Sequence, residues 1–415
     1  MKSLPVALVL VVASVSACVD PGAEPGDGTE DGVSDGSDEA SVASDLDEVV
    51  ARHCDEHNQL PNNVPVGDAT GVFTTVSAHG AIDLGNEFFQ DLGSNGRRCV
   101  SCHVPTSGWT ITPKQLQTVF DATDGGAFED GLGLSAVFRT VDGSNAPNAD
   151  VSTLAKRRKA YSQLLTKGVI RIGLPVPANA EFELVKVDDP YHFASAGELS
   201  LFRRPLPTTN LKFDSTVMWD GREVVPGQTV AFDLNNQAND ATLTHAQGKP
   251  LTQAQRDSIV TFETALASAQ IVDRTAGDLR AAGAQGGPAA ILAQPFHIGI
   301  NDNFGDPVTG AAFNPVAFTI FDRWTTIGQD KGHDCDDHDH GHGHGYGFGH
   351  DRDCDRDRDR DDGVDAARRA VARGQAIFNT RPIAISGVSG INDEAAFGKP
   401  ATLMGTCTTC HDTPN

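Results

Sequence analysis

The chain has 415 residues, 39% of them hydrophobic, and a formal net charge of −24. That length is sufficient for two or three domains with cores of their own, and the negative charge disfavours nucleic acid as a partner. Eleven of the acidic residues lie between Asp20 and Glu48. The rest of the chain is therefore only moderately acidic, and its charge points to no further class of partner.

Residues 1–17 have the pattern of a secretory signal peptide. Lys2 precedes an apolar run, Leu4 to Val15, that is too short to span a bilayer. The sequence Val-Ser-Ala-Cys ending at Cys18 resembles the bacterial lipobox, which predicts cleavage before Cys18 and acylation of its thiol; a lone unpaired cysteine is the alternative. Val19 favours the outer membrane. We expect a protein on the periplasmic side of a bacterial membrane, either lipid-anchored or free in the periplasm.

Residues 18–50 are predicted to form a disordered acidic tether. From Val19 onward this stretch has no lysine or arginine and is rich in Asp, Glu, Gly and Ser. Such a segment cannot bury enough apolar surface to offset the entropy of the chain. A short helix is expected from Asp45 to about His57.

Residues 99–103 read Cys-Val-Ser-Cys-His, the C-x-x-C-H signature of c-type haem attachment. On one helical turn Cys99 and Cys102 share a face, so both thiols can reach the two vinyl groups of one porphyrin. His103 can place an imidazole nitrogen on the iron. One copy of the motif also fits half of a zinc site, a thioredoxin-like redox pair or a disulfide.

The signature occurs again at residues 407–411, which read Cys-Thr-Thr-Cys-His. Cys407 and Cys410 are the expected attachment residues there, and His411 is the expected iron ligand. Two copies in one exported chain favour covalent haem over the alternatives. We therefore predict two covalently bound haem c groups.

The sequence around the two copies repeats as well. Residues 85–89 and 374–378 both have the pattern G-x-x-Φ-F, in which an apolar pair ends a short helix that can pack against a porphyrin edge. Pro105 and Pro414 follow the two histidines and end the attachment helix. The proline carbonyl is expected to accept the outer N–H of the ligand histidine.

Between the two copies, the sequence predicts helices, a strand and loops. Trp109 belongs either over the porphyrin or in the core. Residues 152–167 are expected to form a helix, and residues 170–187 a short strand or two. Thr252–Val272 is the clearest helix in the chain, because it begins with a capping box and its apolar residues recur at helical spacing.

Asp, His, Gly and Arg dominate residues 330–362, which predicts a disordered insertion. Its histidines can bind transition metals loosely, although a solvated tract without a specific role is the simpler interpretation. Cys335 and Cys354 flank this segment and can pair, which leaves Cys54 without an obvious mate.

Residues 217–222 read Val-Met-Trp-Asp-Gly-Arg. Two C-x-x-C-H sites with W-D-G-R between them resemble the bacterial dihaem cytochrome c peroxidase family, which includes the MauG-type enzymes, over roughly residues 75–415. The resemblance implies a mostly α fold, with two cytochrome c-like haem domains, long irregular loops and little strand. It also implies that the two haems face each other, with Trp219 between them as an electron relay.

The resemblance divides the chain into a first, peroxidatic haem domain (51–270), an inter-domain connection (271–329) and a second, electron-transfer haem module (363–415). Hydrogen peroxide would react at the first haem and receive electrons through the second. Reducing peroxide to water takes two electrons, whereas a small donor cytochrome or cupredoxin delivers one at a time. Two haems in one chain can store both. The family also suggests a calcium ion between the domains.

Other site residues follow from the resemblance less directly. Gln228 is the candidate for proton transfer, because it lies nine residues after Trp219 where the family commonly has a glutamine at ten. His245 is preferred over His192 as the distal ligand of the first haem. No acidic residue matches the catalytic glutamate of the family, and three are available: Glu223, Asp233 and Asp240.

The chain stops four residues after His411, so we expect the second module either to be incomplete or to be closed by an upstream residue. Met218 can ligate the second haem, although a packed apolar side chain is the simpler interpretation. Three functions remain open besides a nonfunctional fragment: a peroxidase, a pure electron-transfer cytochrome with both irons six-coordinate, and a MauG-like oxidase of a protein or organic substrate. Trp219 and the polar residues after it favour the peroxidase.

Overall fold

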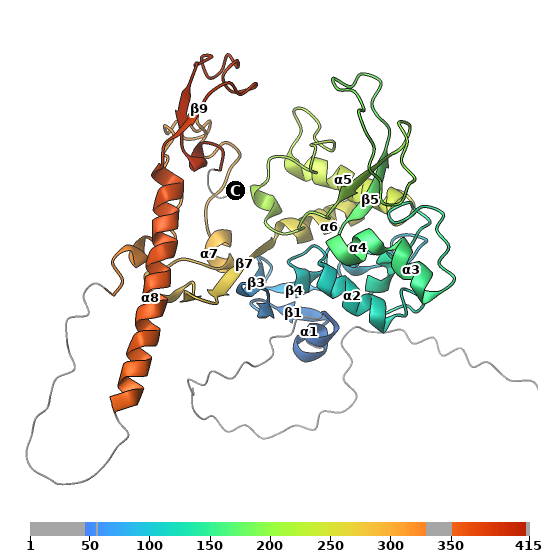
Figure 1. Ribbon diagram of the computed structural model, residues 1–415, viewed down its shortest axis with the longest axis horizontal. Coiled ribbons are helices and arrows are strands. Elements are labelled where there is room, and N and C mark those ends of the chain that lie inside the picture. Colours follow the sequence, from blue (N-terminus) through green and yellow to red (C-terminus); the bar gives the residue numbers. More distant parts are fainter. Residues whose placement is uncertain (1–45, 55–56, 329–350, 412–415) are drawn as a thin grey trace, which may run out of the picture. The chain divides into compact units, whose positions relative to one another are not determined.

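The computed structural model describes residues 46–54, 57–328 and 351–411, which divide into two compact units (Figure 1). Unit 1 comprises Met1–Val64, His79–Thr208 and Val225–Phe262, and unit 2 comprises Pro65–Ala78, Thr209–Val224 and Glu263–Asn415. Each C-x-x-C-H copy belongs to a different unit. The chain passes between the units several times, which differs from the predicted succession of domains.

Unit 1 combines short helices with two-stranded antiparallel sheets. β1 (Gln59–Pro61) pairs with β4 (Ala81–Asp83), and β5 (Ile170–Leu174) pairs with β6 (Leu199–Arg203). The helices are α1 (Leu46–His53), α2 (Pro113–Ala122), α3 (Leu154–Ala160), α4 (Ser162–Lys167), α5 (Val230–Thr244) and α6 (Gln253–Thr264). Short 3₁₀ turns join them: η1 (Glu87–Phe89), η2 (Cys99–Ser101), η3 (Pro105–Ser107) and η4 (Leu134–Val137).

Several local predictions are confirmed in unit 1. The helix expected over residues 152–167 is present as α3 and α4, with a break at Tyr161. The strand expected within residues 170–187 is β5. The capping box of α6 also forms, because the Thr252 amide donates to Gln255 Oε1 at 3.0 Å and the Gln255 amide donates to Thr252 Oγ1 at 3.3 Å.

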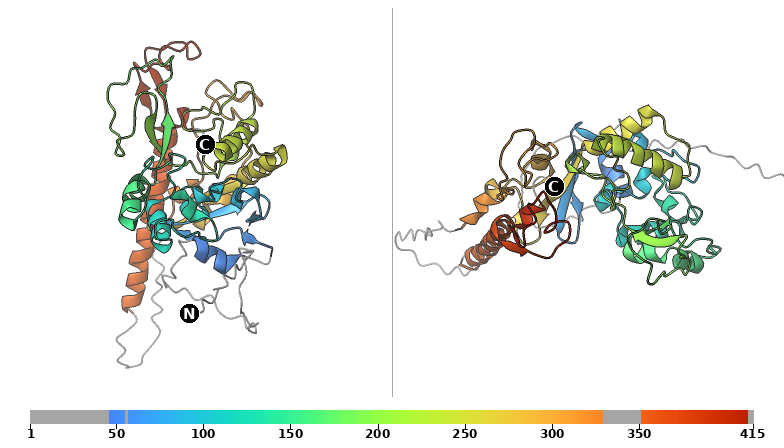
Figure 2. Two further views of the ribbon diagram at one scale, coloured as in Figure 1. Left: turned by 90° about the vertical axis from the view of Figure 1, so that its right-hand side faces the viewer. Right: turned by 90° about the horizontal axis from the view of Figure 1, so that it is seen from above.

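Unit 2 contains a four-stranded antiparallel sheet in the order β2 (Val66–Gly67), β3 (Gly71–Ser77), β7 (Leu266–Asp273) and β8 (Gly277–Asp278). Figure 2 shows the blue β3 and the yellow β7, which lie side by side although they are far apart in sequence. The hydroxyls of Thr75 and Ser268, separated by 193 residues, are 2.7 Å apart. The remaining elements are η5 (Leu211–Phe213), η6 (Ala281–Gly283), α7 (Pro288–Leu292), η7 (Asp322–Thr325), α8 (Asp351–Thr380), β9 (Ile383–Ile385), β10 (Leu403–Gly405) and η8 (Cys407–Thr409).

The prediction of one helix over Thr252–Val272 is wrong in its second half. α6 ends at Thr264, and the chain continues as β7. Ile259 and Phe262 are buried at helical spacing, and Leu266 extends that spacing. Leu266 nevertheless pairs with Ser77 at the end of β3, and the pairing continues to the other end of the strand. Pairing with a distant strand therefore outweighs the local helical pattern.

The expected mostly α fold with little strand is also wrong. Among the helices of the described residues, only α2, α5, α6 and α8 reach ten residues. Each unit combines short helices with small sheets, and neither is the helical haem domain that was expected. Composition gives the reason, because 43 glycines and 22 prolines interrupt helices throughout the chain.

Residues 271–328 belong to unit 2 and supply part of its core, where a connection between domains was predicted for residues 271–329. Trp324 is fully buried, and its Nε1 donates to the Ala281 carbonyl oxygen at 2.9 Å. η7, which contains Trp324, packs against α8. The Arg368 guanidinium lies 5.4 Å from the centre of a Trp324 ring. This segment and α8 therefore form one folded body.

Two predicted disordered segments contain helix where the structure describes them. Residues 351–362 form the first part of α8, so the predicted insertion is wrong for that stretch. Extending a helix that packing has already nucleated costs little per residue, and a composition argument does not capture this. Residues 46–50 of the predicted tether belong to α1, in which Val49 and Val50 are buried. The other residues of both segments lie outside the described ranges.

Cys54 forms a disulfide, although the sequence suggested no mate for it. Cys335, one of the two cysteines expected to pair, lies outside the described residues. Within the part of the chain that the structure describes, no helix combines the length and the apolar character needed to cross a membrane.

Candidate haem-attachment sites

The first C-x-x-C-H copy folds into one tight turn in unit 1. The Cys102 amide donates to the Cys99 carbonyl oxygen at 3.1 Å, and the His103 amide donates to the same oxygen at 3.0 Å. The motif is thus a single helical turn that begins at η2 and ends at His103.

The second copy, in unit 2, adopts the same conformation. The His411 amide donates to the Cys407 carbonyl oxygen at 3.0 Å. The residue before the motif has φ/ψ of −114°/165° in the first copy and −126°/177° in the second. The second cysteine has φ/ψ of −119°/−13° and −120°/−17°. Two turns in different units therefore share one backbone geometry.

In both turns, residues between the two cysteines are buried, whereas the cysteines themselves are at least partly exposed. Three of the four residues between the cysteines are buried, with exposures of 0% for Val100, 1% for Ser101 and 0% for Thr408, whereas Thr409 is half-buried. Four cysteines form no disulfide and are partly or fully exposed: Cys99, Cys102, Cys407 and Cys410. Burial of its surroundings raises the pKa of the Cys102 thiol, while the Arg97 guanidinium acts in the opposite direction. The four residues fit covalent attachment of one haem to each turn.

The imidazole of His103 is oriented by the backbone. Its Nδ1 lies 3.2 Å from the Trp109 carbonyl oxygen, and the Leu206 carbonyl is a second backbone acceptor for the ring. Desolvation lowers the pKa of His103 to about 4, so the ring is neutral near pH 7, as iron ligation requires. The Pro105 carbonyl, which was expected to accept the N–H of His103, instead accepts the Gly108 amide at 3.2 Å. This hydrogen bond closes the 3₁₀ turn η3.

An aromatic ring lies beside each motif histidine. The ring centres of Phe88 and His103 are 6.3 Å apart, and those of Phe378 and His411 are 6.0 Å apart. Phe88 is the fourth residue of its G-x-x-Φ-F stretch, whereas Phe378 is the fifth. Each copy of the repeat thus supplies a phenylalanine ring to its turn, but from a different position, in η1 for the first turn and at the end of the long α8 for the second.

Trp109 is a core residue. It is fully buried, and its ring centre is 5.9 Å from those of Phe88 and Phe262. Its backbone has φ +62°, a left-handed conformation that directs its carbonyl toward His103. Of the two roles that the sequence left open, the core role is the one observed.

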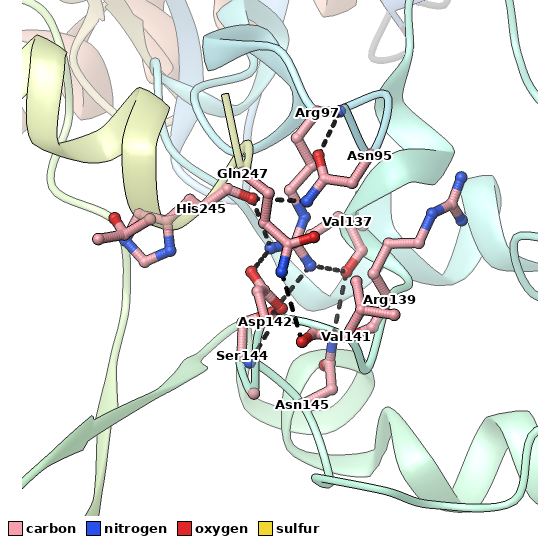
Figure 3. Close-up of polar contacts among 12 residues, drawn as sticks. Asn95, Arg97, Val137, Arg139, Val141, Asp142, Ser144, Asn145, His245 and Gln247 are labelled. Atoms are coloured by element: carbon pink, nitrogen blue, oxygen red, sulfur yellow. Dashed lines mark hydrogen bonds and ion pairs between the residues drawn. The ribbon is translucent and has the colours of Figure 1, made fainter. Parts of the chain in front are cut away.

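Arg97, two residues before the first cysteine, anchors the first turn (Figure 3). It forms an ion pair with Asp142, and both side chains are almost completely buried, with 4% and 3% exposed. Its Nη2 also donates to Ser144 Oγ at 2.8 Å, and its Nη1 donates to the His245 carbonyl oxygen at 3.2 Å. One guanidinium therefore ties the turn to two other segments of unit 1. No local pattern in the sequence marks this residue, because its partners are distant along the chain.

Different residues anchor the second turn. Thr408 Oγ1 donates to the Pro315 carbonyl oxygen at 2.8 Å, and Asn303 Nδ2 donates to the Thr409 carbonyl oxygen at 2.5 Å. Both contacts come from residues 294–317, the segment that also surrounds a cavity of about 270 Å³. The second turn is therefore held by neutral hydrogen bonds, whereas the first is held by a buried charge.

Trp219 and Gln228, the predicted relay and proton-transfer residues, lie on exposed turns in different units. Trp219 belongs to unit 2 and is 64% exposed, and the neighbouring Arg222 pairs with Asp220 at 2.7 Å. Gln228 belongs to unit 1, where its amide donates to the Val225 carbonyl oxygen at 3.0 Å.

Asp233, one of the three acidic candidates, is buried, and its Oδ1 accepts the Val225 amide at 3.0 Å. Its carboxylate is thus engaged in holding the start of α5.

His245, the preferred distal ligand, caps the C-terminus of α5 in unit 1. Its carbonyl oxygen accepts hydrogen bonds from Asn95 Nδ2 at 2.8 Å and from Arg97. In Figure 3 its imidazole points away from the Arg97 cluster, so the backbone and not the ring faces the first attachment segment. Its role as a ligand stays a prediction.

Several predicted ligands and the predicted lipid anchor lie outside the residues that the structure describes. Cys18, the predicted lipid site, lies outside the described residues, as do the histidines of residues 330–350. Across the described ranges, no group of three or more His, Cys, Asp or Glu side chains is placed to hold a metal ion. The calcium ion suggested by the resemblance stays a prediction.

Comparison with models of known protein families, with curated proteins and with solved structures finds no match for this chain.

Proposed function

We propose that this protein is an exported dihaem c-type cytochrome that reduces hydrogen peroxide to water with electrons from a small redox protein. The observation that carries the proposal is the common geometry of the two C-x-x-C-H turns. Both have two cysteines outside any disulfide and one histidine, and both have an aromatic ring beside that histidine. A zinc site, a redox pair or a disulfide does not require such a ring.

The residues of each turn have distinct tasks in this proposal. Cys99 and Cys102 bind one porphyrin through thioether bonds, and Cys407 and Cys410 bind the other. When bound, the two haems supply sites that accept and release one electron each. The Trp109 carbonyl orients the neutral imidazole of His103, which would serve as the iron ligand of the first haem.

Reduction of peroxide requires two electrons and two protons. A cytochrome or cupredoxin donor supplies one electron at a time, so storage in two haems matches the requirement. Trp219 is proposed as the electron relay, and Gln228 as a group that orients or transfers protons near the peroxide. The predicted signal peptide and Cys18 support a position on the periplasmic side of a bacterial membrane, held by a lipid anchor.

A pure electron-transfer cytochrome is the second candidate. It is favoured by Asp233, whose carboxylate accepts the Val225 amide and is therefore committed to structure. Two assays on the purified protein test the two functions. The pyridine haemochrome spectrum counts haem, and oxidation of a reduced small cytochrome by peroxide measures turnover. Two haems with turnover support the peroxidase, two haems without turnover support the electron carrier, and no covalent haem excludes both.

A further inference from the structure

We propose that the hydroxyl of the third motif residue, Ser101 in the first turn and Thr409 in the second, is a positioning group that sets both thiols on one face before haem is attached. The inference rests on the proposed function, because it concerns the residues that would receive the haem. It assigns a role to a position that the C-x-x-C-H signature leaves unspecified.

The first observation is a hydrogen bond that occurs in both turns. Ser101 Oγ accepts the Arg98 amide at 3.0 Å, and Thr409 Oγ1 accepts the Thr406 amide at 2.8 Å. The return bond is also shared, since the Ser101 amide donates to the Arg98 carbonyl oxygen at 3.0 Å and the Thr409 amide donates to that of Thr406 at 3.1 Å. Each pair of bonds closes a small ring around the first cysteine.

The second observation is that a hydroxyl also ties each turn to its unit. Ser101 Oγ donates to the Gly133 carbonyl oxygen at 2.6 Å, and Ser101 is only 1% exposed. In the second turn the neighbouring Thr408 performs this task by donating to the Pro315 carbonyl oxygen. In the first turn, Ser101 both closes the turn and ties it to its unit. In the second turn, Thr409 closes the turn and Thr408 ties it to its unit. The same two contacts are present although the surrounding sequences differ.

Thiol geometry explains why such a closed turn would matter. Each thiol adds across a vinyl group, so that sulfur bonds to one vinyl carbon, the thiol hydrogen goes to the other, and no oxidant is needed. Both additions must occur on one porphyrin, so the cysteines must share a face. A short turn without the hydroxyl samples conformations in which the two cysteines lie on different faces, because isolated helical turns are unstable.

The test compares Thr409→Val, which keeps the shape of the side chain but removes the hydroxyl, with Thr409→Ser, which keeps the hydroxyl. The full chain is produced under conditions of haem attachment, and haem at each site is measured by pyridine haemochrome and by mass spectrometry of the peptides. We expect Thr409→Val to lose most haem from Cys407 and Cys410 while the first site keeps its own. Thr409→Ser should retain two haems, and Ser101→Ala should lose the first haem.

Two further variants control for loss of a hydroxyl as such. Ser107 makes no side-chain hydrogen bond among the described residues, and Thr402 is exposed before the second turn. Ser107→Ala and Thr402→Val should keep both haems. Full haem at both sites in Thr409→Val and Ser101→Ala would overturn the inference, and so would equal loss in Thr409→Val and Thr409→Ser.

A measurement without haem separates this inference from the proposed function. Phenylarsine oxide bridges two thiols on one face, forming two As–S bonds and releasing water. Its binding to the haem-free full chain should weaken about tenfold at the altered turn when the hydroxyl is removed, the effect of one buried hydrogen bond. If the parent protein carried no haem, the proposed function would fail, yet this binding difference would still decide whether the hydroxyl positions the thiols. Unchanged binding would contradict that role.

Discussion

Nδ1 of His103 lies 3.2 Å from the carbonyl oxygen of Trp109, a residue with a left-handed backbone at φ +62°. Trp109 is fully buried, so its carbonyl has a fixed direction. The histidine of the first turn is thus oriented by the core of unit 1. This preorganisation is what a proximal haem ligand requires.

The first prediction concerns the ion pair between Arg97 and Asp142. Removal of one partner leaves an uncompensated buried charge, so Asp142→Ala should destabilise unit 1 by about 3–5 kcal/mol. Thermal unfolding followed by circular dichroism measures the effect, and haem at the first site should fall with it. Arg158 and Asp121 are both more than half exposed and form the control pair. Arg158→Gln should change stability by less than about 1 kcal/mol, and equal effects of both substitutions would refute the anchoring role.

The second prediction concerns Glu263 near the end of α6. Its side chain is only 5% exposed, and burial raises the pKa of the carboxyl to about 8. The unfolded chain ionises this group near pH 4.5, so stability should fall as the pH rises from 4.5 to 8. Glu263→Gln, which never ionises, should remove that slope and stabilise the protein above pH 8 by an amount on the order of 5 kcal/mol.

Urea unfolding at pH 5 and at pH 8.5 measures this difference. The two proteins should be similarly stable at pH 5 and should diverge at pH 8.5. Asp257, exposed on the same helix, provides the matched control Asp257→Asn, which should change the free energy of unfolding by less than about 0.5 kcal/mol. Parallel pH profiles for Glu263→Gln and the parent protein would show that the carboxyl does not titrate in this range.

The third prediction concerns Trp219. Its side chain is 64% exposed, so Trp219→Phe should change the free energy of unfolding by less than about 0.5 kcal/mol. If Trp219 relays electrons, peroxide turnover with a reduced donor should fall tenfold or more, a barrier increase of about 1.4 kcal/mol. Steady-state kinetics and haem content measured on the same sample separate these effects. Unchanged turnover at full haem content would remove the relay role.

Sequence reasoning located both C-x-x-C-H turns, the capping box of α6 and the helices α3 and α4, because each depends on residues that are close along the chain. It wrongly predicted helix at β7. Leu266 continues the helical spacing of α6, but its backbone pairs with Ser77 of β3. Contacts between distant segments cannot be read from a local periodic pattern.

The candidate site shows the same limit. The cysteines and histidines follow from a short motif, but Arg97 acts through Asp142, which is 45 residues away, and through His245, which is 148 residues away. The predicted Pro105 acceptor was local, whereas the observed acceptor at Trp109 depends on the burial of that side chain. The sequence therefore indicated the reactive groups but not the residues that orient them.

The number of haems that stay bound to the denatured chain shows whether both turns carry covalent haem. The parent protein should keep its haem through acid–acetone extraction and give a pyridine haemochrome of two per chain. Cys102→Ala and Cys410→Ala should each remove about one, since each disables one attachment turn. Haem that is extracted completely from the parent protein, or a count that neither substitution changes, would contradict the account.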